Sequence, residues 1–204
     1  MKIFLVRHGE DESGYRGGWS SRGLVSNGIS QSRKLAEYLH QNKDMFKINT
    51  IFSSDLNRAV ETSRPIETML NIQAGYFPHW REMNNGLLAG LANTEAERDF
   101  PGVYFNTLQM DEAFPGGESP IAFFQRVKSV FEEFCSQIER REVKSNVLIV
   151  THGGFINVLY YLLNGLEWTN KSSFYPIGNA SVHTIEKTDD GWEITESNDM
   201  KHLE

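Results

Sequence analysis

Two short apolar runs end in the same way, and this repetition limits the folds open to the chain more than any other feature. Residues 3–6 read Ile-Phe-Leu-Val and run into Arg7, His8 and Gly9, while residues 147–151 read Val-Leu-Ile-Val-Thr and run into His152 and Gly153. Continuous apolar runs of this length are typical of strands buried on both faces of a parallel sheet. Ligands bind at the carboxyl ends of such strands, so we expect the two histidines to meet in one site.

The residues at these strand ends favour an anionic ligand. Arg7 offers a planar fork of N–H donors that matches phosphate or carboxylate oxygens. A histidine can act as a base, a nucleophile or a metal ligand, and Gly9 lets the backbone turn sharply or approach a ligand closely. A single histidine at a strand end is more often structural. Two such endings, one of them preceded by an arginine, indicate a functional site.

The composition narrows the class of protein and its partners. The chain has 204 residues, of which 39% are hydrophobic and 23% charged, as is ordinary for a globular α/β domain. Its net charge of −7 argues against a nucleic-acid surface, and no apolar run approaches the roughly 20 residues that span a bilayer. Cys135 is the only cysteine, and the first predicted strand leaves no room for a signal peptide. We therefore expect a cytoplasmic protein without nucleic-acid or membrane partners.

The remaining patterns predict alternating strands and helices. Strands are expected at residues 50–53 and 74–77, with a hairpin formed by residues 182–186 and 192–195. Helices are expected at about 27–41, after an N-cap at Ser26, and after residues 54–55, with a kink or restart at Pro65. Two further helices are expected, one from Ser119 and Pro120 onwards and one at about 154–163. This order predicts an α/β fold whose sheet is mostly parallel with an antiparallel tail. We expect residues 1–204 to form a single domain, with about 78–118 as a cap over the sheet edge.

Several polar and aromatic residues have two interpretations that the sequence leaves open. Tyr15, Arg16 and Trp19, in the loop at 11–23, either contact substrate or pack the loop. Arg58, in the first turn of its helix, lies near amides that bind anions, or it forms a surface ion pair. Glu82 is either an acid or a solvated loop carboxylate. Aromatic residues that either line an entrance or simply pack are Tyr15, Trp19, Trp80, Phe105 and Phe114.

Arg7, His8, Arg58 and His152, together with Glu82, would form a dense positive pocket in an otherwise acidic chain. A phosphoryl group suits this pocket, because arginine forks bind it bidentately. One histidine can attack phosphorus to form a phosphohistidine, and a second, if protonated, can stabilise charge on the phosphoryl oxygens. A carboxylic acid can protonate the leaving oxygen and then activate water. Metal binding is the rival use, but arginines repel a cation and no His-x-x-x-His pair is present.

These motifs resemble those of the histidine phosphatase superfamily, also called the phosphoglycerate mutase-like family. The resemblance rests on blocks that occur in the family's order: residues 5–10, 18–24 with Gly28 and Gln31, 53–62, 81–82 with Gly86, 116–119 and 151–154. It implies a three-layer α/β/α sandwich with a small irregular cap, and no metal or organic cofactor. It also implies that His8 is the phosphorylated nucleophile and Glu82 the proton donor, while Arg7, Arg58 and His152 form the phosphate pocket.

The sequence departs from the family's pattern after Glu10. The family usually has Ser or Thr at the position of Asp11 and an Asn a few residues later, and this Asn is missing here. We expect Tyr15 or Arg16 to supply the missing phosphate contact. Trp19 and Gly153 are further expected substrate contacts.

The family divides mainly into hydrolases and sugar-phosphate mutases. Mutases resemble this chain with a sizeable insertion between the acid loop and the Gly-Gly-Glu-Ser block, and here only residues 87–115 lie between them. We therefore expect a phosphatase acting on small phosphomonoesters, with a bisphosphate-dependent phosphoglycerate mutase as the alternative. A non-catalytic phosphate-binding regulatory protein is a second alternative, which the presence of all five pocket residues opposes.

Overall fold

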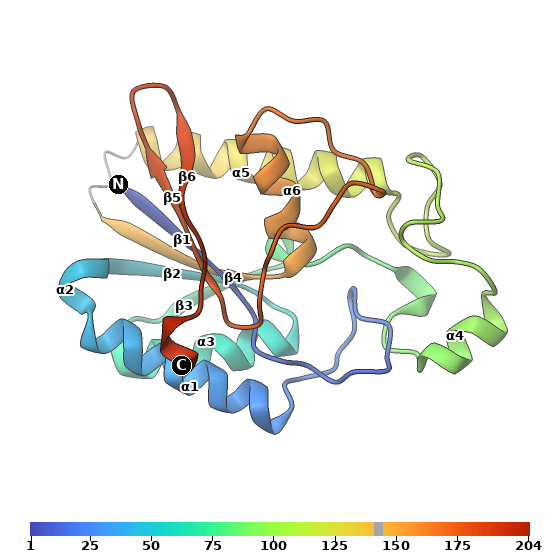
Figure 1. Cartoon of the computed structure of the whole chain (residues 1–204), viewed down its shortest axis with the longest axis horizontal. Coiled ribbons are helices and arrows are strands. Elements are labelled where there is room, and N and C mark those ends of the chain that lie inside the picture. The colour runs from blue at the N-terminus through green and yellow to red at the C-terminus, as the bar shows by residue number, and fades with distance from the viewer. Residues whose placement is uncertain (141–144) are drawn as a thin grey trace.

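Six strands form one sheet in the computed structural model, which describes residues 1–140 and 145–204. Their order across the sheet is β3-β2-β4-β1-β5-β6 (Figure 1). The first four pair in parallel, whereas β5 runs antiparallel to both of its neighbours. The sheet is therefore mostly parallel with an antiparallel tail, as predicted. The strands are β1 (Lys2–Arg7), β2 (Ile48–Ser54), β3 (Ala74–Phe77), β4 (Asn146–Thr151), β5 (Val182–Lys187) and β6 (Trp192–Asp199).

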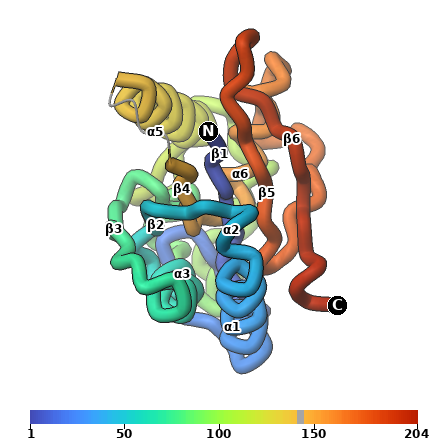
Figure 2. The backbone as a smooth tube through the Cα atoms, turned by 90° about the vertical axis from the view of Figure 1, so that its left-hand side faces the viewer, coloured from blue at the N-terminus to red at the C-terminus, as the bar shows by residue number. Residues whose placement is uncertain are grey.

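Helices cover both faces of this sheet, which makes three layers (Figure 2). Helices α1 and α3 lie side by side on one face, and α5 and α6 cover the other. The C-terminal turn η3 packs against α1. The helices are α1 (Ser26–Gln41), α2 (Lys43–Phe46), α3 (Asn57–Leu70), α4 (Asn93–Asp99), α5 (Pro120–Arg140) and α6 (Gly153–Leu163), with short 3-10 turns η1 (Pro78–Trp80), η2 (Gly86–Leu88) and η3 (Lys201–Leu203).

The apolar run of β1 supplies both cores. Successive side chains of a strand point to opposite faces of the sheet. Phe4 and Val6 accordingly pack under α1 and α3, while Ile3 and Leu5 pack under α5 and α6. A strand buried on both faces needs apolar residues at every position, which is why residues 3–6 show no polar alternation. The predicted three-layer α/β/α fold class is confirmed.

The predicted N-cap at Ser26 is wrong, and so is a restart at Pro65. Helix α1 already includes Ser26, its N-cap residue is Val25, and no side chain caps it. Helix α3 continues through Pro65 from Asn57 to Leu70 and does not restart there. Packing of its buried face against α1 keeps this helix continuous although Pro65 lacks one backbone N–H.

The segment between β3 and α5 contains η1, η2 and α4 and lies at the end of the sheet where β1 and β4 terminate (Figure 1). We propose that it is a cap, residues 78–118, within a single domain spanning 1–204. Leu88, Leu108 and Phe114 of this segment support the single domain, because they belong to the same core cluster as Leu5 of β1.

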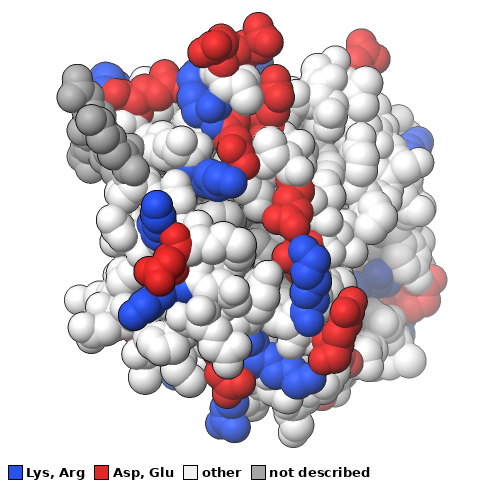
Figure 3. Space-filling model, turned by 60° about the vertical axis from the view of Figure 1, so that its left-hand side comes forward, with Lys and Arg blue, Asp and Glu red and all other residues white. Residues whose placement is uncertain are grey.

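Acidic and basic side chains are interspersed on the face drawn in Figure 3, so this face carries no broad basic surface. Among the helices that the structure describes, none is both long enough and apolar enough to cross a membrane.

Candidate active site

The register between β1 and β4 brings the two histidines together. Arg7 pairs with Thr151, so His8 and His152, which follow them, leave the sheet side by side. Their ring centroids are 5.0 Å apart, the ring planes are inclined at 56°, and both side chains are buried. The structure therefore brings the two strand-end histidines together at this edge of the sheet, where the sequence predicts them.

Hydrogen bonds define which nitrogen of His8 carries the proton. Its Nδ1 atom lies 2.8 Å from the carbonyl oxygen of Gly9, which can only accept, so Nδ1 donates. Its Nε2 atom accepts from Nε of Arg58 at 3.2 Å. Nε2 is therefore the unprotonated nitrogen, and its lone pair is the one that can attack phosphorus.

The surroundings keep both histidines neutral. Burial lowers the pKa of His8 well below its usual value, and the charges of Arg58 and Arg7 lower it further. Burial and the same two arginines also hold the pKa of His152 far below its usual value. A neutral His8 is what a nucleophile requires. His152 would gain a proton only if a bound phosphoryl group offset the arginine charges.

The second arginine reaches the histidines from the first turn of α3. The hydroxyl of Ser54 accepts from the backbone N–H of Leu56 at 3.3 Å, just before that helix begins. Arg58 follows with only 2% of its surface exposed, and its Nη2 donates to the carbonyl of Gly18 at 2.7 Å. Its Nε lies 3.6 Å from Oδ2 of Asp11, the residue at which this chain departs from the family's pattern.

Three buried nitrogens of this cluster have no hydrogen-bond partner among the described residues: Nε of Arg7, Nη1 of Arg58 and Nδ1 of His152. Other nitrogens of Arg7 and His152 do have partners. Nη1 of Arg7 donates to the carbonyl of Ile177 at 2.7 Å, and Nε2 of His152 lies 2.8 Å from the Ser54 hydroxyl. If this hydroxyl donates, Nδ1 of His152 carries a proton and becomes a donor. Buried unpaired donors are rare in folded proteins and often belong to ligand sites.

Glu82 approaches the cluster from the loop after η1. One of its carboxylate oxygens accepts from the backbone N–H of Gly154 at 2.9 Å, and the other accepts from Met83 N–H at 3.0 Å. A Cβ atom at position 154 would lie 2.3 Å from this carboxylate, so glycine is required for the close approach. Burial lowers the pKa of the Arg7 guanidinium, and the nearby Glu82 carboxylate offsets part of this decrease.

Arg126 of α5 holds the backbone of the same loop. Its guanidinium donates to the carbonyls of His79, Arg81 and Glu82 at 3.2, 3.1 and 3.0 Å. Its remaining hydrogen bonds go to both carboxylate oxygens of Glu118, at 2.6 and 2.9 Å. The sequence pattern gave no sign of this role, because most of the partners are backbone carbonyls distant along the chain.

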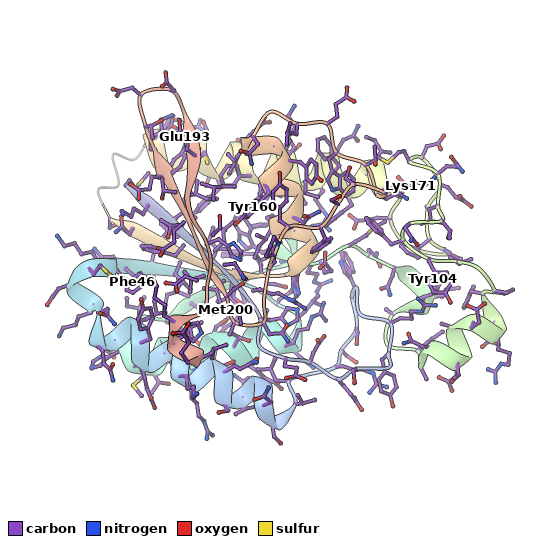
Figure 4. All side chains as sticks on the ribbon, in the orientation of Figure 1. Phe46, Tyr104, Tyr160, Lys171, Glu193 and Met200 are labelled. Carbon is purple, nitrogen blue, oxygen red and sulfur yellow. The ribbon has the colours of Figure 1, made fainter. Side chains whose placement is uncertain are left out.

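A cavity of about 260 Å³ adjoins this cluster on the side of the cap. Its wall includes Glu82 and Gly154, which belong to the surroundings of the histidines, together with Gly18 and Arg16. The cap residue Tyr104 marks this end of the molecule in Figure 4. The aromatic residues in its wall are Tyr104, Phe105, Phe114, Phe123, Trp168 and Phe174.

The predicted substrate contacts occupy different places. Arg16 lines the cavity, whereas the Tyr15 ring lies beneath the guanidinium of Arg22, with 3.2 Å from the guanidinium carbon to the ring centroid. Trp19 donates from its indole nitrogen to the carbonyl of Glu82 at 2.7 Å. Gly153 adjoins Nε of Arg7, since a Cβ atom there would lie 3.5 Å from it. Their roles toward substrate stay predictions.

Among the aromatic residues considered for an entrance, Phe105 and Phe114 line the cavity, and Trp80 is fully packed in the core. The sequence reasoning missed Ser54, Arg126, Asn157, Trp168 and Phe174. Ser54 could have been found from its position at the carboxyl end of β2, next to β4.

Within residues 1–140 and 145–204, no three or more His, Cys, Asp or Glu side chains come together in a way that could hold a metal ion. Cys135 is buried in the core, and burial raises the pKa of its thiol to about 12, so it is an unreactive packing residue.

Two histidines and two arginines gathered at the carboxyl edge of an α/β sheet, with a carboxylate beside them, are typical of proteins that transfer phosphoryl groups. Comparison with known families agrees with this class. The chain belongs to the histidine phosphatase superfamily, branch 1, whose family model matches residues 3–200.

Individual relatives support the same assignment. A metal-independent phosphoserine phosphatase of Arabidopsis thaliana is 30% identical over 99% of this chain and 83% of its own length. Phosphoserine phosphatase 1 of Hydrogenobacter thermophilus is 27% identical over 91% of this chain and 86% of its own. Among solved structures, a mycobacterial glucosyl-3-phosphoglycerate phosphatase superposes with a TM-score of 0.75 at 25% identity, covering 97% of this chain and 98% of that one. The predictions of the family and of a histidine-type phosphoric monoester hydrolase are confirmed.

Proposed function

We propose that this chain hydrolyses small phosphomonoesters without a metal ion, through a phosphohistidine on His8. The observation that carries the proposal is the set of unpartnered buried nitrogens on Arg7, Arg58 and His152. Leaving a buried polar group unpaired costs about 1–3 kcal/mol. The oxygens of a phosphoryl group bound in front of His8 would satisfy all three nitrogens at once.

The reaction has two steps in this proposal. Nε2 of His8 forms a bond to phosphorus while the bond from phosphorus to the ester oxygen breaks. Glu82, in its protonated form, gives its proton to the departing oxygen, so the product leaves as an alcohol. Glu82 then takes a proton from water, the water oxygen attacks phosphorus, and the phosphorus–nitrogen bond breaks. Inorganic phosphate leaves and both residues return to their starting forms.

The relatives guide the choice of substrate. Several carry the name phosphoserine phosphatase, and the first of them is described as metal-independent. Others that match at lower identity are named phosphoglycerate mutases, which keeps that reaction as the alternative. We propose a phosphatase as the main activity, because the segment between the acid loop and α5 is short. We also propose a cytoplasmic location, which the single buried cysteine supports.

The test compares wild type with His8→Ala in the presence of EDTA, using release of inorganic phosphate from p-nitrophenyl phosphate and from phosphoserine. His40→Ala is the matched control, because His40 is exposed on α1. We expect hydrolysis by wild type and the control, none by His8→Ala, and an acid-labile phosphoenzyme in quenched wild type. Phosphate trapped on a serine or an aspartate instead of His8 would refute the mechanism. Turnover of 3-phosphoglycerate that requires its bisphosphate, without net hydrolysis, would establish the mutase alternative.

A further inference from the structure

The cavity beside Glu82 is where the organic part of the substrate has to lie. Glu82 must reach the oxygen that leaves phosphorus, and the alcohol attached to that oxygen extends away from His8. Glu82 and Gly154 belong both to the surroundings of the histidines and to the cavity wall. The chemistry of this wall therefore decides which phosphomonoesters fit, if the proposed function holds.

Six side chains of the wall are aromatic, and three of their rings pack against one another. Trp168 is 7% exposed, and its ring stacks on Phe124 with 5.6 Å between centroids and 13° between planes. Phe105 and Phe123 contact the same indole at centroid distances of 6.1 and 6.3 Å. Fixed rings of this kind favour a flat apolar group, because aromatic pairs gain energy beyond the area that they bury.

At the rim, Phe174 is 59% exposed although it lines the cavity. Its ring also reaches the boundary with the phosphate pocket, since it lies 3.7 Å from where a Cβ atom of Gly153 would be. A large exposed aromatic side chain at the mouth of an apolar cavity is a position that a bound ring would cover.

The charged groups of the wall do not match a zwitterion such as phosphoserine. Glu82 is the only carboxylate lining the cavity in the described chain, and it is needed as the proton donor. The side-chain oxygens of Asn157 and Asn85 already accept from the backbone N–H groups of Tyr175 and Trp19, at 3.0 and 3.2 Å. A substrate ammonium group would therefore enter the cavity without a free anionic partner.

Arg16, by contrast, offers a positive charge that has no ion-pair partner among the described residues. Its guanidinium lies over the ring of Tyr104, with 4.2 Å to the centroid, and its buried Nε has no partner among the described residues. Its backbone is fixed by hydrogen bonds to Leu91 at 2.9 Å and from Gly90 at 2.8 Å. A guanidinium that stacks on a ring and has no carboxylate partner in the described part of the chain is suited to an anionic group of a ligand.

We infer that the preferred substrate is a phosphomonoester of an alcohol that carries an apolar ring with a second anionic group, which the aromatic wall and Arg16 bind together. The inference rests on the proposed function and specifies its substrate class. The cavity volume of about 260 Å³ is sufficient, since engineered cavities of about 150 Å³ admit benzene. One substituted ring therefore fits between the wall and the phosphate pocket.

The kinetic test uses three primary alkyl esters, so that the leaving oxygens are chemically similar: phosphoserine, benzyl phosphate and 4-carboxybenzyl phosphate. We expect kcat/KM for benzyl phosphate to exceed that for phosphoserine by about tenfold or more, from burial of the ring. The carboxyl group should add about another fivefold through Arg16. In Arg16→Gln the ratio of 4-carboxybenzyl to benzyl phosphate should fall to about one, whereas Arg33→Gln, at an exposed position of α1, should keep it.

Removing the rim aromatic is a second variant test. Phe174→Ala should raise KM for benzyl phosphate about fivefold or more while changing that for phosphoserine less. Phe77→Ala is the control, because Phe77 is also a partly exposed aromatic but lies on β3, outside the cavity wall. A preference for phosphoserine over both ring esters in the wild-type enzyme would overturn the inference and leave the proposed phosphatase intact.

Binding of phosphonates separates the inference from the proposed activity. Calorimetry would compare 2-phenylethylphosphonate with 2-amino-4-phosphonobutanoate, a phosphonate of the shape and charge of phosphoserine. Tighter binding of the phenyl compound supports the inference even if no ester is hydrolysed. Absence of hydrolysis would defeat only the proposed function. Equal or tighter binding of the amino acid phosphonate overturns the inference whatever the enzyme hydrolyses.

Discussion

Nε of Arg58 donates to Nε2 of His8 across 3.2 Å, so the guanidinium proposed to bind phosphate also holds the ring of the proposed nucleophile. This bond and the one from Nδ1 of His8 to the Gly9 carbonyl together select a single tautomer of the ring. The backbone N–H of Gly9 is held in turn by the hydroxyl of Thr62 at 3.0 Å, one helical turn after Arg58. Residues in the first two turns of α3 thus fix the position of His8, which follows β1.

Arg58→Lys should lower kcat by about a hundredfold or more, because lysine keeps the charge but cannot bind both the His8 ring and phosphoryl oxygens from one planar group. The measurement is hydrolysis of p-nitrophenyl phosphate at saturation. Arg64→Lys, at an exposed position of the same helix, is the matched control and should keep wild-type rates. A change in KM alone for Arg58→Lys would contradict a role in organising the nucleophile.

Glu82→Gln should slow esters with poor leaving groups much more than esters with good ones, because only the former need a proton as the ester bond breaks. We expect a loss of about a hundredfold or more with benzyl phosphate and of about tenfold or less with p-nitrophenyl phosphate. Glu37→Gln on α1 provides the control, since Glu37 is exposed. Equal slowing of both esters would argue against proton donation by Glu82.

We expect Arg126 to act on the same step through Glu82, as a positioning residue, because it holds the backbone of the Glu82 loop. Arg126→Met removes the hydrogen bonds to the carbonyls of His79, Arg81 and Glu82, so the carboxylate should lose its alignment with the leaving oxygen. We expect about a tenfold loss with benzyl phosphate, a smaller one with p-nitrophenyl phosphate, and partial recovery in Arg126→Lys.

A merely structural Arg126 would give a different pattern. It would slow both esters by the same factor, in step with a loss of folded protein measured by thermal unfolding. Arg140→Met, near the exposed end of α5, is the control for loss of an arginine from this helix.

The sequence revealed the centre of the site because its information is local. An unbroken apolar run followed by Arg7 and His8, and another followed by His152, are enough to predict that charged residues meet at one edge of a parallel sheet. Arg58 and Glu82 could be named from the resemblance to the family. The structure places Arg58 against His8, and Glu82 against the backbone of Gly154, two residues after His152.

The wall of the cavity was largely beyond prediction. Trp168 and Phe174 lie in an irregular stretch after α6, where no periodicity indicates which side chains point inward. Tyr15 and Arg16 are adjacent in one loop, yet only Arg16 reaches the cavity. Such choices depend on contacts between segments distant along the chain, such as Arg16 against Tyr104, which a single sequence does not display.

His183, a third buried histidine, should make the stability of the fold depend on pH. It lies on β5 with its Nδ1 atom 2.6 Å from the hydroxyl of Tyr160 and its Nε2 atom 2.9 Å from that of Ser181. Burial lowers its pKa to about 4, against an ordinary value near 6.5 in an unfolded chain. Between these two values the unfolded chain binds more protons than the folded one, so the free energy of unfolding falls as the pH drops below 6.5.

The expected size of this effect is about 2.5 kcal/mol between pH 7.5 and pH 4.5, since each pKa unit corresponds to about 1.4 kcal/mol. Urea unfolding at the two pH values measures it. In His183→Gln the decrease on acidification should be smaller by about this amount, whereas His40→Gln, at the exposed end of α1, should behave as wild type. His8 and His152 also have lowered pKa values and add a decrease of the same sign, which His183→Gln retains. An identical acid dependence in His183→Gln and wild type would show that His183 is not the group responsible.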